Sequence, residues 1–129
     1  MAENVLAREF QTLAGEAASG HLIIEADAAE RCAKWCDDYI ADLRGLSLRT
    51  RRMVDADSFG DLASAKELAK KFANLAEGGE GSGSYLDAAT KHIEVLTHMA
   101  DMYRKAGAAY KNCDEATQLA IKQQTTTLD

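Results

Sequence analysis

The sequence predicts an all-α protein: an antiparallel helical hairpin or bundle with two long helices, plus shorter helices at the N-terminus and in the connection. The 129 residues contain no proline, although average usage of about 5% would give roughly six, and helix interiors exclude proline. Aromatic residues make up only 6% of the chain, which disfavours β-sheet. Apolar residues recur at alternating steps of three and four along two long stretches, which is the period of an amphipathic helix.

The N-terminal stretch has the apolar spacing of a short helix. Its predicted packing face consists of Leu6, Phe10, Leu13 and Ala17. Ser19 and Gly20 follow this face. Because glycine inside a helix costs only about 1 kcal/mol relative to alanine, the helix either ends at Ser19-Gly20 or continues through it.

The strongest pattern predicts a long helix from His21 to about Met53. Its main stripe has the spacing of a coiled-coil seam and comprises Leu22, Ala26, Ala29, Ala33, Cys36, Ile40 and Leu43. A second apolar stripe runs beside it and comprises Ile24, Ala28, Cys32, Trp35 and Tyr39. The two stripes together are wide enough to meet two neighbours. Four arginines near the end of this helix, Arg44, Arg49, Arg51 and Arg52, are interpreted as a solvated C-terminal part, where cations are favoured.

Residues 55–84 are predicted to form a turn, a shorter helix and a loop. Residues 55–60 are rich in turn-forming side chains. Ser64 and Glu67 fit a capping box for a helix that ends near Glu77. The Gly/Ser-rich residues 78–84 are interpreted as a flexible loop.

A second long helix is predicted from a cap at Ser84 to about Ile121. Its main stripe comprises Leu86, Ala89, Ile93, Leu96, Ala100, Tyr103, Gly107 and Tyr110. We therefore expect one helical domain over residues 1–122 and a flexible tail over 123–129. The predicted dimer or core face, covered either by the short helices or by a second chain, includes Leu22, Trp35, Tyr39, Ile40, Leu43, Ile93, Leu96, Met99 and Tyr103.

Charge and composition disfavour several classes of function. A net charge of −6 opposes binding to nucleic acid. No apolar run approaches the roughly 20 residues of a membrane span, and the N-terminal residues lack the pattern of a signal peptide. The cysteines Cys32, Cys36 and Cys113 match neither a disulfide framework nor a zinc pattern. They are interpreted as core residues; an oxidised link from Cys113 to Cys32 or Cys36 is the alternative.

Catalytic patterns are also missing from the sequence. Glu94 and His98 have the wrong spacing for the Glu-x-x-His motif of a di-iron bundle. The Gly-rich residues 78–84 lack the lysine of a phosphate-binding loop. We therefore predict no enzyme activity, no cofactor and no metal ion, and we keep a metal-binding or catalytic bundle as the third alternative.

Tyr110 and Asp114 are four residues apart near the end of the second long helix. On one helix, a phenol and a carboxylate at this spacing form a single exposed patch suited to docking. The alternative is a core tyrosine beside a surface aspartate.

Small size, two long helices, no signal peptide and this Tyr-x-x-x-Asp motif together resemble the WXG-type helical-hairpin proteins of type VII (ESX) secretion. In that family the motif acts in a bipartite secretion signal, so the resemblance assigns this role to Tyr110 and Asp114. The family's Trp-x-Gly turn is absent, and its nearest counterpart is Phe59-Gly60. The chain therefore resembles a divergent member, nearer to the EspA- and EspC-like substrates.

The resemblance implies a small secretion substrate, or its co-secreted partner, that acts through helical dimerisation and docking on the secretion machinery. Its partners would be a second copy or another helical-hairpin protein, with the type VII secretion ATPase as the implied receptor. It would be cytoplasmic before export, then secreted or at the cell envelope, without a cleaved signal peptide. The alternative is a cytoplasmic helical adaptor or assembly protein with no secretion role, in which Tyr110 belongs to the core.

Overall fold

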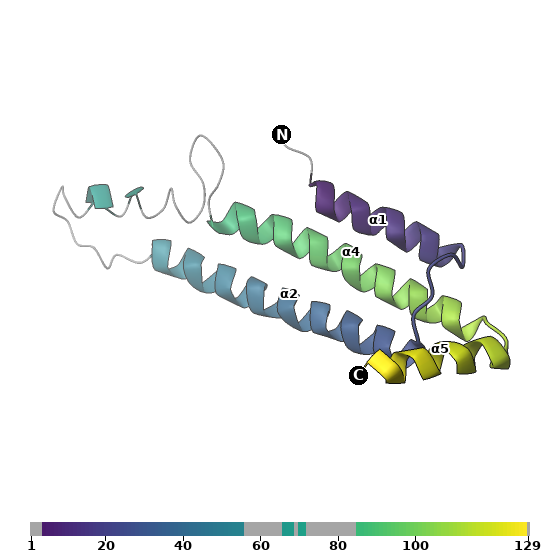
Figure 1. Cartoon of the computed structure of the whole chain (residues 1–129). Coiled ribbons are helices and arrows are strands. Elements are labelled where there is room, and N and C mark those ends of the chain that lie inside the picture. The colour runs from purple at the N-terminus through teal and green to yellow at the C-terminus, as the bar shows by residue number, and fades with distance from the viewer. Residues whose placement is uncertain (1–3, 56–65, 69, 72–84, 129) are drawn as a thin grey trace. The chain divides into compact units, whose positions relative to one another are not determined.

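The computed structural model describes residues 4–55, 66–68, 70–71 and 85–128, and no strand occurs among them. Their four main helices are α1 (Val5–Ala18), α2 (Ala26–Asp55), α4 (Tyr85–Lys111) and α5 (Glu115–Leu128) (Figure 1). The all-α prediction with two long helices is confirmed. Several predicted features lie outside the described residues: Phe59 and Gly60, Ser64 of the capping box, and the Gly-rich loop 78–84.

Helix α1 has a defined end at each side. The side chain of Asn4 accepts a hydrogen bond from the backbone N–H of Ala7 at 3.4 Å, which is an N-cap. At the other end, Gly20 adopts a φ of 83°, a conformation that glycine reaches at little cost. The N–H of Gly20 donates to the carbonyl of Ala17, and the N–H of His21 to that of Glu16. The helix therefore ends at Ser19-Gly20, which is one of the two possibilities that the sequence leaves open.

Helix α2 begins five residues later than the apolar pattern predicts, so the expected start at His21 is wrong. The N–H of Ile24 donates to the carbonyl of Ala106 at 3.3 Å, which places this segment outside the helix. The carboxylate of Glu25 then accepts hydrogen bonds from the N–H groups of Ala28 at 2.9 Å and Asp27 at 3.1 Å. Glutamate is not among the preferred capping residues, so the sequence carries no clear signal for this start.

The unfolding free energy is expected to fall in acid partly because of this cap. The N–H of Ala28, and then that of Asp27, lower the pKa of Glu25. A carboxyl group with a lowered folded-state pKa stabilises the fold fully above its unfolded pKa, about 4.3, and loses this effect as the pH falls through the folded-state pKa. Protonation of Asp114 also lowers the free energy of unfolding in acid, because hydrogen bonds from Thr117 lower the pKa of this carboxyl in the folded state.

Urea unfolding at a series of pH values checks the contribution of Glu25. Glu25→Gln should be less stable than the wild type at neutral pH, and the two proteins should converge toward about pH 3. A difference that stays constant across the series would contradict the role of the carboxylate.

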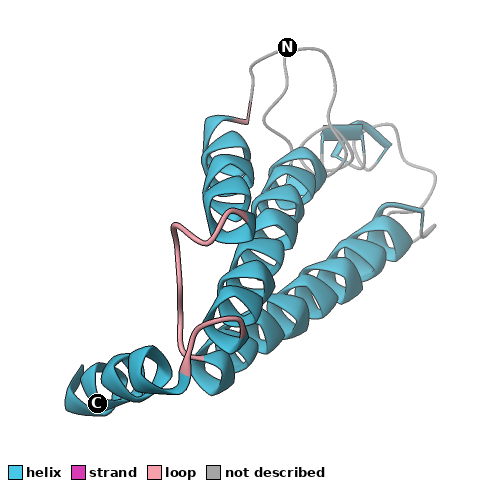
Figure 2. Cartoon of the chain, turned by 90° about the vertical axis from the view of Figure 1, so that its right-hand side faces the viewer, coloured by secondary structure: helices cyan, strands magenta, loops and turns pink. Residues whose placement is uncertain are grey.

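The chain forms two compact units, the first comprising residues 1–40 and 94–129 and the second residues 41–93. In the first unit, α1 and the first half of α2 lie on opposite sides of α4 (Figures 1 and 2). The side-chain amide of Asn4 donates to Glu94 at 3.3 Å and joins α1 to α4. On the other side, the Arg104 guanidinium donates to Asp37 at 2.7 Å and joins α4 to α2.

The contact between α2 and α4 in the first unit is built from small side chains. Ala29, Ala33 and Cys36 are at most 1% exposed, and Gly107 is also buried. A Cβ atom on Gly107 would lie 3.0 Å from the Cβ of Ala29, closer than ordinary van der Waals contact. The two backbones therefore approach closely at this point, and glycine is what permits it.

The packing face predicted for α1 is partly wrong. Ala7, Ala14 and Ala17 are buried, whereas Leu6 is 52% and Leu13 is 40% exposed. Ala17 belongs to both faces and Phe10 is half-buried, so the buried face is rotated by only about 50° from the predicted one. Alanines allow α1 to approach α4 closely, which the larger leucine side chains would prevent.

The predicted continuous helix to Ile121 is also wrong. Helix α4 ends at Lys111, and α5 begins at Glu115. The side-chain amide of Gln118 donates to the carbonyls of Cys113, Tyr110 and Lys111 at 3.0, 3.1 and 3.3 Å, and so satisfies acceptors at the end of α4. Helix α5 continues to Leu128, where the sequence predicts a flexible tail from residue 123.

Candidate functional site

The proposed recognition motif lies at the corner between α4 and α5. Tyr110 is 8% exposed, and its hydroxyl donates to the carbonyl of Gln118 at 3.1 Å. Asp114 is exposed, and its carboxylate accepts the N–H of Thr117 at 2.7 Å as the N-cap of α5. The predicted exposed patch on a single helix is therefore wrong, because the chain turns between the two residues and buries the phenol.

One residue of this corner, Asp114, has an identifiable sequence signal. Asp114 precedes Glu115, Thr117 and Gln118, and an aspartate followed by an acidic first turn is typical of a helix start. In the sequence, apolar residues continue at helical spacing through Cys113 and Ala116, and this period favours an unbroken helix there. Nothing local marks the capping of α4 by Gln118, because that bond depends on the angle between the helices.

The predicted dimer or core face divides into three classes of exposure. Ile40 and Leu96 are buried. The half-buried residues are Leu22, Leu43, Ile93, Met99 and Tyr103. Trp35 and Tyr39 are exposed, at 57% and 38%. Most of this face is thus shielded within the chain, and the two aromatic residues are the exception.

Trp35 and Tyr39, which we call the aromatic pair, lie one turn apart on α2. Their ring centroids are 5.4 Å apart with an interplanar angle of 52°, a tilted contact of the kind that aromatic rings favour. Cys32, one turn before Trp35 on the predicted second stripe, is half-buried. In this unit, α1 lies on the other side of α4 from the first half of α2, the helix that carries the aromatic pair (Figure 2).

The rest of the exposed surface of α2 at this level is polar. On the side of α2 away from the aromatic pair, Arg104 of α4 binds both Asp37 and Glu30, at 2.7 and 3.4 Å. Lys34 and Asp38 form an exposed ion pair of 3.8 Å on the same helix. An exposed aromatic pair on an otherwise polar helix surface has the composition of a protein-binding surface.

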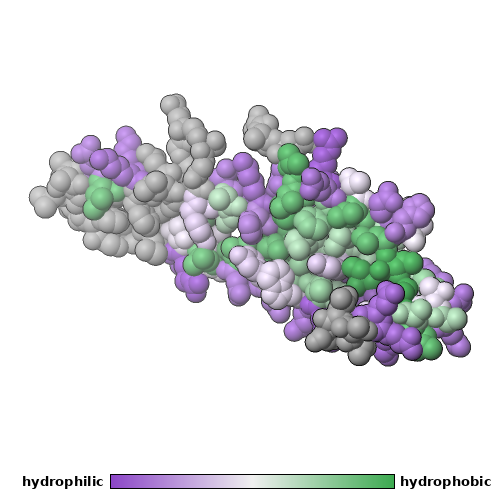
Figure 3. All heavy atoms as spheres, viewed as in Figure 1, coloured by the Kyte–Doolittle hydropathy of each residue, from purple (hydrophilic) through white to green (hydrophobic). Residues whose placement is uncertain are grey.

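Other apolar side chains are exposed in the first unit. Figure 3 shows an apolar area over its helices, bordered by strongly polar residues. On α1, Val5, Leu6 and Leu13 are 60%, 52% and 40% exposed. Contiguous apolar surface on a protein of this size is typical of contacts with other proteins.

The cysteines are free thiols in this structure. Cys36 is fully buried, and burial, followed by the nearby charge of Asp37, raises the pKa of its thiol. Cys32 and Cys113 are half-buried, and the Cys113 thiol donates to the carbonyl of Ala109 at 3.4 Å. The packing interpretation is therefore confirmed for Cys36.

Metal and membrane sites can be assessed within the described part of the chain. There, no three His, Cys, Asp or Glu side chains converge as metal ligands would. Among the same residues, no helix combines the length and apolar character needed to cross a bilayer. The chain matches no protein-family model, no curated protein and no solved structure. The surfaces described above are therefore the features of the chain that indicate its function.

Proposed function

We propose that the protein is a helical adaptor that binds a partner protein along α2, with Trp35 and Tyr39 as the anchor of the contact. The observation that carries this proposal is the exposure of the aromatic pair. Trp35 is the single tryptophan of the chain and is 57% exposed, although its helix buries Ala29, Ala33 and Cys36 on another face. Tryptophan and tyrosine are the residue types most enriched among side chains that dominate binding energy.

The position of the pair on the helix supports a helical partner. Cys32, Trp35 and Tyr39 follow one another at steps of three and four along α2. A partner helix lying along this ridge could pack against all three side chains, as ridges pack into grooves between helices. The partner is then another helical protein, in keeping with the expectation from sequence.

The burial of Tyr110 bears on the alternative of type VII secretion. That proposal rests on the resemblance to WXG-type proteins and needs Tyr110 and Asp114 to be recognised together. A phenol turned inward and bonded to Gln118 supports the adaptor, because it leaves little of the tyrosine for a receptor to contact. The second candidate function is export through such a system, with Asp114 as the accessible part of the signal.

Site-specific photo-crosslinking tests the adaptor proposal and captures the partner covalently, whatever its identity. A photoreactive phenylalanine analogue replaces Tyr39 in one variant and Lys34, exposed on another side of α2, in a control variant. In the native host, we expect an adduct of defined mass from position 39 and none from position 34. The adduct is then identified by mass spectrometry.

The same assay gives a quantitative prediction for Trp35. Trp35→Ala should weaken binding by at least about tenfold, since truncating a central aromatic anchor costs about 2 kcal/mol or more. Because the side chain is exposed, the helical circular dichroism of the variant should match the wild type. Equal crosslinking yields with and without Trp35, or equal yields at positions 39 and 34, would contradict the proposal.

A further inference from the structure

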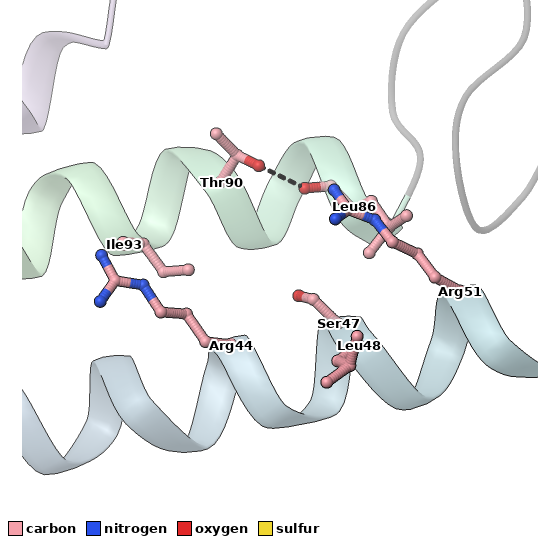
Figure 4. A pocket seen from close by; sticks show the side chains of 7 residues that line it. All are labelled: Arg44, Ser47, Leu48, Arg51, Leu86, Thr90 and Ile93. Carbon is pink, nitrogen blue, oxygen red and sulfur yellow. Dashed lines mark hydrogen bonds between the residues drawn. The ribbon is translucent and has the colours of Figure 1, made fainter.

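A groove in the second unit carries two arginines over an apolar floor. It has a volume of about 330 Å³ and is lined by Arg44, Ser47, Leu48, Arg51, Leu86, Thr90 and Ile93, which we call the arginine groove (Figure 4). Arg44, Ser47 and Arg51 point from α2 toward α4. Leu48 is 49% exposed, whereas Leu86 is buried.

The cationic groups of this groove are available for a ligand. Among the described residues, no hydrogen-bond or ion-pair partner is present for the guanidinium groups of Arg44 and Arg51 or for the hydroxyl of Ser47. Residues 43–52 contain four arginines and no acidic residue, in a chain whose net charge is −6. The groove is therefore a positive surface on an acidic protein, and a second copy of the chain would be attracted to it.

Helix α1 offers a surface with matching chemistry. Glu9, Leu13 and Glu16 are exposed and lie at positions i, i+4 and i+7 on one face of the helix. Arg44, Leu48 and Arg51 have the same i, i+4, i+7 spacing on α2. Each charged pair is thus separated by seven residues, about 10.5 Å along a helix, with a leucine between.

We propose that α1 of a second copy of this chain binds in the arginine groove. Glu9 and Glu16 pair with Arg44 and Arg51, and Leu13 packs on Leu48. The contact uses leucine side chains that are otherwise 40% and 49% exposed. Glu16 already lies 3.1 Å from His21, but both side chains are more than half exposed, and exposed pairs of this kind are weak enough to exchange.

This self-association is separate from the adaptor contact. It involves neither Trp35 nor Tyr39, so Trp35→Ala with Tyr39→Ala should leave it unchanged. The two proposals can therefore fail independently.

The proposal is tested with charge-reversal variants, whose mass in solution is measured by light scattering across a dilution series. The wild type should show a mass that rises with protein concentration, and added salt should reduce the association. Arg44→Glu with Arg51→Glu should weaken it by about tenfold or more, and so should Glu9→Arg with Glu16→Arg. Mixing the two double variants should restore association, because each groove then faces an α1 of opposite charge.

Two controls separate the contact from general effects of charge or folding. Arg49→Glu with Arg52→Glu makes the same change in charge on the same helix, outside the groove, and should associate like the wild type. Restoration on mixing requires both double variants to be folded, so it also excludes misfolding as the cause of their monomeric state. A wild type that stays monomeric throughout, an Arg44/Arg51 variant that associates normally, or a mixture that stays monomeric would each overturn the proposal.

Discussion

Tyr110→Ala is expected to lower the free energy of unfolding by about 3 kcal/mol, a typical cost of truncating a buried aromatic side chain. The phenol is 8% exposed, and its hydroxyl donates to the carbonyl of Gln118. Its removal leaves a cavity at the corner between α4 and α5 and takes away the donor to that carbonyl. Urea unfolding followed by circular dichroism measures the loss.

Tyr110→Phe is the matched control for this effect. It keeps the ring and removes the one hydrogen bond, so it should cost only about 1 kcal/mol. If Tyr110→Ala were as stable as the wild type, the corner would not depend on the buried phenol. An exposed tyrosine, as the secretion signal requires, would then become the better account.

The expected instability also determines how the secretion alternative is tested. Loss of export by Tyr110→Ala could result from unfolding alone. Asp114→Asn is more informative, because asparagine also caps helices well and only the charge is removed. Export of this variant at the wild-type level would contradict a signal that depends on the carboxylate.

Gly107→Val is expected to destabilise the protein by about 2–3 kcal/mol, because it forces extra atoms into a closely packed contact. The first added atom, Cβ, would already lie 3.0 Å from the Cβ of Ala29 and 3.7 Å from the Cα of Ala26. Either α2 and α4 must move apart, or the side chains around Ala29 must lose their packing. The effect is measured as a lower urea midpoint with an unchanged m-value.

Gly45→Ala, in α2, is expected to change the free energy of unfolding in the opposite direction. Gly45 is an exposed residue within α2, and a Cβ there would meet nothing within 4 Å. Alanine should therefore stabilise the protein by about 0.5–1 kcal/mol through its better helix propensity. A valine at 107 as well tolerated as the alanine at 45 would show that the two helices are not in close contact at Gly107.

Local sequence patterns are enough to predict the two long helices and the side chains at their seam, although not where each helix begins and ends. Ala29, Ala33, Cys36 and Ile40 are predicted as one stripe and are all buried. This works because helical period is a local property that repeats every 3.6 residues whatever the partner. The break at Ser19-Gly20 stays open at the level of sequence, because glycine inside a helix costs only about 1 kcal/mol.

Tertiary structure alone decided which of two competing faces each helix buries. On α1, close approach to α4 selects the alanines over the larger Leu6 and Leu13. On α2, the stripe with Ala29, Ala33 and Cys36 is buried, and Trp35 of the neighbouring stripe stays exposed. At residues 112–114, bonds from Gln118 to carbonyls five to eight residues earlier favour a corner over the continuous helix that the apolar period predicts. The choices on α1 and α2 depend on contacts between residues far apart in the chain, and none of the three has a periodic signature in the sequence.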